Sequence, residues 1–214
     1  MLPGMRRAAR TGTIAPVSTT TPPDIVVQRI NGAARAVASL RGQSEAIAAA
    51  ATAITQCLIR GGTVYTCGNG GSAAEALHLA EELIGRYRSN RPALRGICLN
   101  ADPTALTCIA NDFGFDAIFA RQCETLLTPR DVLVVFSTSG RSANLIHALE
   151  TARAKGAMTI GLLGRGGGPC APLCAHAIVV DDQDSGHIQE AHQVVLHIFC
   201  EYVEGECMAG PNDG

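Results

Sequence analysis

The chain has 214 residues, a length that allows one domain with a sizeable hydrophobic core. Its 17 basic and 19 acidic residues give a formal net charge of −2, so the sequence offers no general attraction to nucleic acid or to a membrane surface. No apolar run is long enough to span a bilayer, and the arginines near the start precede no apolar segment, which argues against a secretory signal. We therefore expect a cytoplasmic protein without a nucleic-acid or membrane partner.

Nine cysteines are scattered along the chain, mostly beside Val, Ile, Leu and Ala. Their number is odd, and the closest pair, Cys170 and Cys174, lacks the second pair that a zinc knuckle needs. We interpret them as buried thiols in a reducing compartment rather than as disulfides or a metal cluster.

Residues 1–23 are rich in Thr, Pro and Ala and are predicted to form a disordered tail. Two helices follow, over residues 24–40 and 43–60, with apolar residues at helical spacing and many alanines in the second. Alanine lets helices approach one another closely. Because both helices precede the first strand, their apolar faces have little of this chain to pack against unless another chain supplies a surface. We predict that both helices serve oligomerisation.

The remaining segments alternate between short apolar runs and helical patterns. Strands are predicted at 64–67, 94–99, 131–136, 158–163 and 177–180, and the continuous Val/Leu run of the third indicates burial on both faces. Helices are predicted at 73–83, 103–110, 116–127, 142–155 and 185–206, with a flexible tail over 208–214. This alternation predicts an α/β fold, with a doubly wound, mainly parallel five-stranded sheet flanked by helices, in one domain over residues 24–207.

The first predicted strand leads into Gly68-Asn69-Gly70-Gly71-Ser72, a tight turn that bulkier residues would not make. Ser72 stands where a helix N-cap belongs, and the start of a helix presents backbone N–H groups to an anion, usually a phosphate. The pattern is not Gly-x-Gly-x-x-Gly and no lysine follows Gly71, so dinucleotide and nucleoside triphosphate sites lose support.

A second loop, Ser137-Thr138-Ser139-Gly140-Arg141-Ser142, follows the third predicted strand and opens a helix. Four hydroxyls within six residues suit several phosphate oxygens, although an ordinary helix cap with spare serines would look the same. Ligands of doubly wound sheets bind at the carboxyl ends of the strands, where both loops lie. We therefore predict a phosphosugar site at this edge of the sheet.

Two helices carry candidate catalytic side chains. His78 and Glu82 are four residues apart, so they share one helix face, a spacing that is also common on solvated faces. The last helix carries Gln189 and, within an apolar run, His197, which is either a satisfied core histidine or a catalytic one. Gln189 and His197 lie about 12 Å apart along a helix and roughly 80° around it. We therefore favour a site at a subunit boundary.

Six motifs occur in the order that they have in a known family. They are Gly68-Asn69-Gly70-Gly71-Ser72, His78-x-x-x-Glu82, Gly85-Arg86-Tyr87, Asn111-Asp112-Phe113-Gly114, Ser137-Thr138-Ser139-Gly140-x-Ser142 and Ile188-Gln189-Glu190-x-His192. Over about residues 24–206 the chain thereby resembles the phosphoheptose isomerases (sedoheptulose 7-phosphate isomerases) of the sugar isomerase (SIS) domain group. The resemblance implies the SIS fold and a cytoplasmic homotetramer with active sites at subunit interfaces. It also implies conversion of sedoheptulose 7-phosphate to D-glycero-D-manno-heptose 7-phosphate, the first step towards activated heptose.

The resemblance implies roles for individual residues as well. Glu82 is expected to be the base and His197 its acid/base partner. The phosphate is expected to contact Ser137, Thr138, Ser139 and Ser142, and the rest of the substrate Asn69, Gly70, Gly71, Ser72, Glu82, Asn111, Asp112 and Gln189. Members of the family bind zinc through residues matching His78, Glu82, Gln189 and His197, so we expect one Zn²⁺ per subunit. This set has no thiolates, which is unusual for a structural zinc site.

At one point the chain departs from the family pattern. His187 precedes Ile188 and Gln189 where relatives often carry an arginine, which removes the basis for a guanidinium contact there.

Aldose–ketose isomerisation moves one proton between neighbouring carbons through an enediol, while another moves between the oxygens. A carboxylate suits the carbon proton and an imidazole suits the oxygens, and Glu82 and His197 fit these roles. A metal would instead polarise the carbonyl or orient the substrate. Two alternatives remain open: a non-catalytic SIS protein that binds a protein partner, and a sensor or an isomerase of another sugar phosphate.

Overall fold

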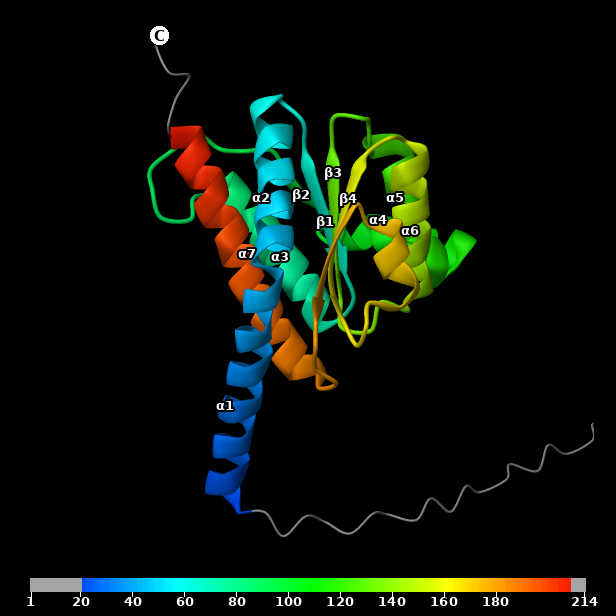
Figure 1. The fold of residues 1–214 in the computed structure, drawn as a ribbon. Coiled ribbons are helices and arrows are strands. Elements are labelled where there is room, and N and C mark those ends of the chain that lie inside the picture. Colours follow the sequence, from blue (N-terminus) through cyan, green and yellow to red (C-terminus); the bar gives the residue numbers. More distant parts are fainter. Residues whose placement is uncertain (1–20, 209–214) are drawn as a thin grey trace, which may run out of the picture.

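A computed structural model describes residues 21–208 of the chain (Figure 1). Of the tails predicted over 1–23 and 208–214, residues 1–20 and 209–214 lie outside the described residues, whereas Pro22, Pro23 and Met208 are helical, so the tail prediction was wrong for these three. Five parallel strands form one sheet in the order β2-β1-β3-β4-β5. They are β1 (Val64–Gly68), β2 (Gly96–Cys98), β3 (Val132–Ser137), β4 (Met158–Gly164) and β5 (His176–Val180). The predicted doubly wound parallel sheet is confirmed.

Helices cover both faces of this sheet (Figure 1). One face carries α1 (Pro22–Ser39), α2 (Ser44–Ile59), α3 (Gly71–Ile84) and α7 (Ser185–Met208). The other face carries α4 (Pro103–Phe113), α5 (Ala120–Leu126) and α6 (Ala143–Ala154). Short 3₁₀ turns, η1 (Leu40–Gln43), η2 (Phe115–Ala117) and η3 (Gly168–Leu173), join some of these elements.

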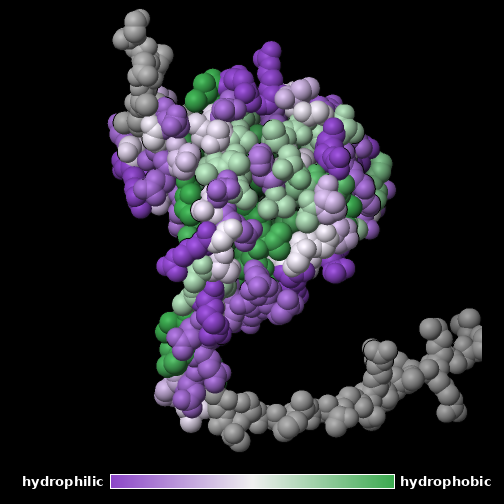
Figure 2. Space-filling model, viewed as in Figure 1, coloured by the Kyte–Doolittle hydropathy of each residue, from purple (hydrophilic) through white to green (hydrophobic). Residues whose placement is uncertain are grey.

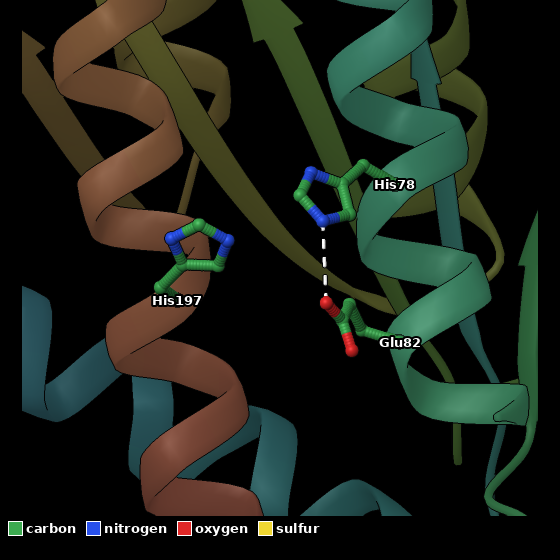
Figure 3. Close-up of side chains that lie close together, drawn as sticks. All are labelled: His78, Glu82 and His197. Carbon is green, nitrogen blue, oxygen red and sulfur yellow. Dashed lines mark hydrogen bonds and ion pairs between the residues drawn. The ribbon is translucent and has the colours of Figure 1, made fainter. Parts of the chain in front are cut away.

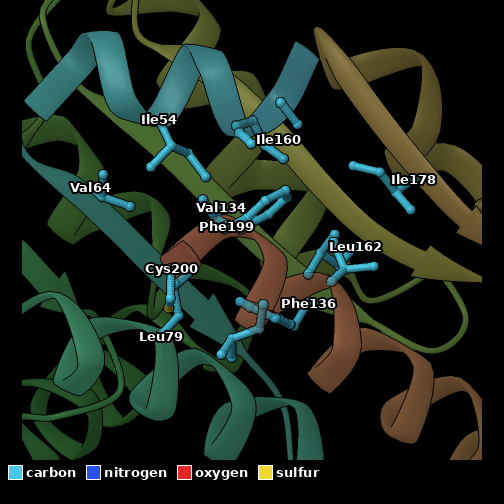
Figure 4. Close-up of a cluster of buried hydrophobic side chains, with 14 of the residues drawn as sticks. Ile54, Val64, Leu79, Val134, Phe136, Ile160, Leu162, Ile178, Phe199 and Cys200 are labelled. Carbon is cyan, nitrogen blue, oxygen red and sulfur yellow. The ribbon is translucent and has the colours of Figure 1, made fainter. Parts of the chain in front are cut away.

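The hydrophobic core has two halves, one on each side of the sheet. Successive side chains of β3 alternate between them: Val134 and Phe136 pack under α2, α3 and α7, whereas Leu133 and Val135 pack under α5 and α6. Figure 4 shows the first half, in which Phe199 of α7 meets these strand side chains. The continuous Val/Leu run is therefore buried on both faces, as the sequence predicts.

Helix α1 has two parts with different surroundings. Its second half packs against α7, with Gly32 and Ala36 buried. Its first half projects from the body of the molecule (Figure 1), and its apolar side chains are exposed there (Figure 2). The exposed apolar residues of this half are Ile25, Val26, Val27 and Ile30. They form an unpaired apolar surface of the single chain.

Several predicted boundaries differ from the structure. Helix α1 begins at Pro22 rather than at residue 24, because proline suits the first helical turn and the Asp24 carboxylate accepts a hydrogen bond from the Thr21 backbone N–H at 3.3 Å. Helix α3 begins at Gly71, so Ser72 lies inside its first turn and is not the N-cap. Gly70, with φ of +58°, occupies the cap position and turns the chain into the helix earlier than predicted.

The segment between β2 and β3 also differs from the prediction. Helix α4 continues to Phe113, so Asn111 and Asp112 stand in its last turn and not in a loop. Gly114, with φ of +87°, ends the helix. The single helix predicted at 116–127 is divided into the 3₁₀ turn η2 and α5.

Candidate active site

The two loops predicted to bind phosphate follow neighbouring strands, β1 and β3. The chain leaves β1 for α3 on one face of the sheet and leaves β3 for α6 on the other face. Open α/β sheets bind their ligands at such a switch point, at the carboxyl ends of the strands. Gly68 is required in the first loop, since a Cβ there would lie 2.4 Å from the Ser72 carbonyl oxygen.

A reciprocal amide pair joins the two loops. Asn69 Nδ2 donates to Asn144 Oδ1 at 3.0 Å, and Asn144 Nδ2 donates back to Asn69 Oδ1 at 2.9 Å. Asn144 is buried in the first turn of α6. Asn144 was not among the predicted site residues, although a polar residue two positions after Ser142 was a signal for such a role.

The Ser137–Ser142 loop is held in shape by its own hydrogen bonds. The Ser137 hydroxyl accepts from the Gly140 backbone N–H at 3.0 Å, and the Ser139 hydroxyl accepts from the Arg141 N–H at 3.3 Å. Ser142 is the N-cap of α6, and its side chain makes no capping hydrogen bond. A helix N-terminus and several hydroxyls that still have a hydrogen to donate suit the oxygens of a phosphate.

His78, Glu82 and His197 converge between α3 and α7 (Figure 3). His78 Nε2 lies 3.2 Å from Glu82 Oε1, and the ring centroids of His78 and His197 lie 5.2 Å apart. The side chains of His78 and Glu82 are 33% and 15% exposed, so both remain accessible from solvent. His197 is therefore not a core histidine satisfied by the protein interior: it faces a histidine and a carboxylate at the edge of a partly open site.

This side-chain group suits a divalent metal as well as proton transfer. One donor atom from each of the three residues lies within 4.8 Å of the other two. Two imidazole nitrogens and one carboxylate oxygen form a ligand set typical of catalytic zinc, which keeps a fourth position for water or substrate. A carboxylate and an imidazole at this spacing also form a general acid/base pair.

Two further side chains, Gln193 and Tyr87, lie near this group and were not among the predicted site residues. Gln193 lies between Gln189 and His197 on α7, and its Oε1 is 2.9 Å from His78 Nδ1. The ring of Tyr87 stacks on His197 with centroids 5.5 Å apart. The sequence signal for Tyr87 was the Gly85-Arg86-Tyr87 motif; Gln193 had no signal beyond its place on the last helix.

Gln189 lies at a different point of the site. A Cβ on Gly71 would come within 2.4 Å of Gln189 Nε2, so the amide of Gln189 packs directly on the glycine turn. Within one chain, α7 therefore presents Gln189 to the start of α3 and presents His197 to His78 and Glu82, further along α3.

Asn111 and Asp112 are not brought to this group by the chain itself. They lie exposed in the last turn of α4, where Asn111 Nδ2 donates to Asp112 Oδ1 at 2.7 Å. Helix α4 packs on the face of the sheet opposite α3 and α7.

Behind the site, two buried polar side chains of α3 and α7, Glu75 and His192, lie next to each other. His192 Nε2 lies 3.2 Å from the Leu163 carbonyl oxygen and therefore donates to it, while His192 Nδ1 lies 3.7 Å from Glu75 Oε2. Both side chains are almost fully excluded from solvent. His192 and Glu75 thus place two buried polar side chains next to each other in the packing between α3 and α7.

Comparison with known proteins identifies the class of protein to which the chain belongs. The family model of the SIS domain matches residues 30–164, which include the first four strands and both loops. The chain is 47% identical over 161 residues to a phosphoheptose isomerase of Solidesulfovibrio magneticus, which covers 75% of this chain and 78% of that protein. Phosphoheptose isomerase 1 of Campylobacter jejuni is 45% identical over 165 residues, covering 77% of this chain and 87% of that protein.

A solved structure agrees with the sequence comparison. A phosphoheptose isomerase from Neisseria gonorrhoeae superposes with a TM-score of 0.81 at 35% identity, covering 86% of this chain and 100% of that one. The chain therefore belongs to the phosphoheptose isomerase family. Among residues 21–208, no helix is both long and apolar enough to cross a bilayer.

Proposed function

We propose that this protein is an isomerase that converts sedoheptulose 7-phosphate to D-glycero-D-manno-heptose 7-phosphate. The observation that carries the proposal is the convergence of His78, Glu82 and His197 in a chain 45–47% identical to phosphoheptose isomerases. A phosphate loop without this group would fit a sensor or a partner-binding protein equally well. Membership of the family makes an enzyme the better explanation.

Different residues bind different parts of the substrate. The hydroxyls of the Ser137–Ser142 loop and the N-terminus of α6 hold the phosphate; the loop's proposed ligands are Ser137, Thr138, Ser139 and Ser142. The turn over residues 69–72 and the amide of Gln189, which lie against each other, hold the sugar. The phosphate thereby anchors the substrate while the reacting carbons extend towards α3 and α7.

Two proton transfers then accomplish the reaction. Glu82 takes the proton from C1 of the ketose and returns it to C2, which interconverts ketose and aldose through the enediol. His197 donates a proton to the oxygen on C2 and accepts the one from the oxygen on C1, so the enzyme ends each cycle in its original protonation state. Tyr87, stacked on His197, keeps the imidazole in its orientation.

We also propose one Zn²⁺ per subunit, held by His78, Glu82 and His197, with Gln189 as the fourth expected ligand. The support is the donor chemistry of the three converging side chains. When bound, the ion would polarise the sugar carbonyl. Gln189 packs on Gly71, and Gln193 is the glutamine that contacts His78 in the single chain. A ligand role for Gln189 therefore requires its side chain to move.

The proposed assembly is a cytoplasmic homotetramer with active sites at subunit interfaces. Two observations support it. The first half of α1 exposes a row of apolar side chains that a single chain leaves uncovered. Asn111 and Asp112 are exposed at the end of α4, where they are available to contact substrate in the site of a neighbouring subunit.

The test is isomerase activity on sedoheptulose 7-phosphate, with and without chelator and added zinc, for the wild type and His197→Ala. We expect turnover by the wild type and a loss of at least about 100-fold in the variant. His147→Ala, which removes an exposed histidine of α6, is the matched control and should retain activity. No turnover by a folded wild-type protein under any of these conditions would overturn the proposal and favour a partner-binding function.

A further inference from the structure

Arg165 has an unusual backbone conformation. It follows the carboxyl end of β4, and with φ of +49° it is the one residue other than glycine with positive φ in the described part of the chain. This conformation is unfavourable for a residue with a side chain, and three glycines that tolerate it follow directly. Strain of this kind persists where the surroundings impose it, and it is concentrated at functional sites.

The side chain of Arg165 is held in one place by two hydrogen bonds. Its Nε donates to the Gln183 carbonyl oxygen at 3.0 Å, and its Nη2 donates to the Ser185 hydroxyl at 2.7 Å. Arg165 is exposed, and no carboxylate among residues 21–208 forms a salt bridge with its guanidinium. A fixed positive charge is thus available beside the start of α7.

The hydrogen bond to Ser185 continues to the phosphate loop. Ser185 Oγ lies 3.3 Å from Thr138 Oγ1. A guanidinium only donates, so the Ser185 oxygen accepts from Arg165 and its own hydrogen is free to point at Thr138. Thr138 then accepts from Ser185, which leaves the Thr138 hydrogen to be donated elsewhere. The guanidinium fixes the direction of the first bond, and donation from Ser185 to Thr138 is the direction in which the second bond leaves Thr138 free to donate to a phosphate oxygen.

Close backbone packing keeps the loop of Arg165 against the Ser137–Ser142 loop. A Cβ on Gly164 would lie 2.8 Å from the Thr138 carbonyl oxygen, and one on Gly140 would lie 1.9 Å from the Gly167 carbonyl oxygen. The Cys170 backbone N–H also donates to the Gly140 carbonyl oxygen at 3.0 Å. The glycines on both sides therefore permit an approach that brings the guanidinium near Thr138.

We infer that Arg165 is a positioning residue of the phosphate site, which acts through Ser185 to aim the Thr138 hydroxyl at a phosphate oxygen. The positive charge of Arg165 also favours binding of the phosphate as a dianion, because it polarises the hydrogen bonds that run through Ser185 and Thr138. The inference rests on the proposed function and specifies how that site recognises its substrate's phosphate. Because the phosphate does not react, Arg165 contributes to binding in the ground state and in the transition state alike.

A purely structural role is the alternative. Arg165 also ties β4 to the turn before α7 through Gln183, and this bond alone would explain its fixed side chain. Arg165→Gly separates the two explanations, because glycine relieves the unfavourable φ while it removes the guanidinium. If the role is positioning, the variant loses phosphate affinity without losing thermal stability. If the role is structural, its melting temperature falls while phosphate affinity is kept.

The experiment measures kcat and KM for sedoheptulose 7-phosphate, the dissociation constant of inorganic phosphate, and Tm, for the wild type and Arg165→Gly. We expect KM and the phosphate dissociation constant to rise about tenfold, the size of one charge-assisted hydrogen bond, with kcat changed less than about threefold. Tm should not fall. Arg130→Gln is the control for loss of one positive charge, since Arg130 is exposed just before β3, at the opposite end of that strand.

A second variant tests the route through Ser185. Ser185→Ala should raise KM by a similar factor, and the double variant Arg165→Gly/Ser185→Ala should be no worse than either single one, because both interrupt the same chain of hydrogen bonds. Independent, multiplying effects would overturn the inference, as would a lowered Tm with unchanged KM. Should the wild type lack isomerase activity, the proposed function fails, yet phosphate affinities of the wild type and Arg165→Gly still test the role of Arg165.

Discussion

Glu81 and Glu82 are adjacent on α3 but have different surroundings. Glu82 is half-buried, contacts His78 and faces His197 (Figure 3), whereas Glu81 is exposed on another side of the helix. The sequence singled out Glu82 through its spacing from His78. That it faces a second histidine, from a helix more than a hundred residues further along the chain, is a finding of the structure.

Glu82→Gln should abolish proton transfer at carbon while it leaves the shape of the site unchanged. We expect kcat to fall at least about 100-fold, because an amide does not accept the proton, with inorganic phosphate binding retained. Steady-state kinetics and phosphate titration measure both effects. Glu81→Gln is the matched control and should keep wild-type kcat. Equal activity of the two variants would contradict the role of Glu82 as the base.

At the scale of elements, the connection between α3 and β2 depends on one carboxylate of α7. Glu204 accepts hydrogen bonds from the backbone N–H groups of Tyr87, Arg88 and Ser89 at 2.9 to 3.1 Å. It also lies 3.4 Å from Arg91 Nε, and the side chains of Arg91 and Glu204 are only 2% and 7% exposed. Because Tyr87 stacks on His197, Glu204 also fixes one wall of the site.

These contacts make the contribution of Glu204 to stability dependent on pH. Desolvation raises the pKa of its carboxyl, but the hydrogen bonds from Ser89, Arg88 and Tyr87 and the charge of Arg91 outweigh it, so the pKa lies below its usual value of 4.5. The stabilisation is therefore fully present above pH 4.5 and is lost as the pH falls through the lowered pKa of the folded state.

Glu204→Gln should lower the free energy of unfolding by about 2 kcal/mol at pH 7, since the charge-assisted hydrogen bonds are weakened. The difference from the wild type should shrink as the pH falls below the usual carboxyl pKa, which urea unfolding at a series of pH values measures. Glu201→Gln removes an exposed partner of Arg88 on the same helix and should change stability little. A difference that stays constant down to low pH would contradict this account.

At the scale of the whole molecule, the first half of α1 is the feature that a single chain leaves incomplete. Its exposed apolar residues, Ile25, Val26, Val27 and Ile30, lie within one broad side of the helix, whereas Gln28 lies on the opposite side. A surface of this kind on a projecting helix is typical of a subunit interface.

Ile30→Asp should therefore dissociate the proposed tetramer, because a carboxylate would be buried in an apolar interface. Gln28→Asp introduces the same charge on the opposite side and should leave the assembly intact. Light scattering coupled to size exclusion measures the mass of each variant, and we expect activity to fall together with the tetramer. A monomeric variant with full activity would contradict active sites at subunit interfaces.

Local patterns in the sequence were sufficient for most of the architecture. The order of strands and helices, the burial of β3 on both faces and the two loops at strand ends follow from hydrophobic periodicity and from glycine and hydroxyl residues within short segments. Helix boundaries were less predictable, since α4 runs on to Phe113 and Gly70 rather than Ser72 caps α3. These ends depend on single backbone angles at Gly70 and Gly114, which composition does not specify.

By itself, then, the sequence determined the fold class, the family and the residue types of the site, because each of these depends on patterns within short segments of the chain. Only the tertiary structure decided which residues meet: His197 joins His78 and Glu82, whereas Gln189 packs on Gly71. It also decided that Arg165 reaches Thr138 through Ser185. These contacts join elements that are distant in the sequence, and the packing of α7 against α3 and the sheet sets the direction of their side chains.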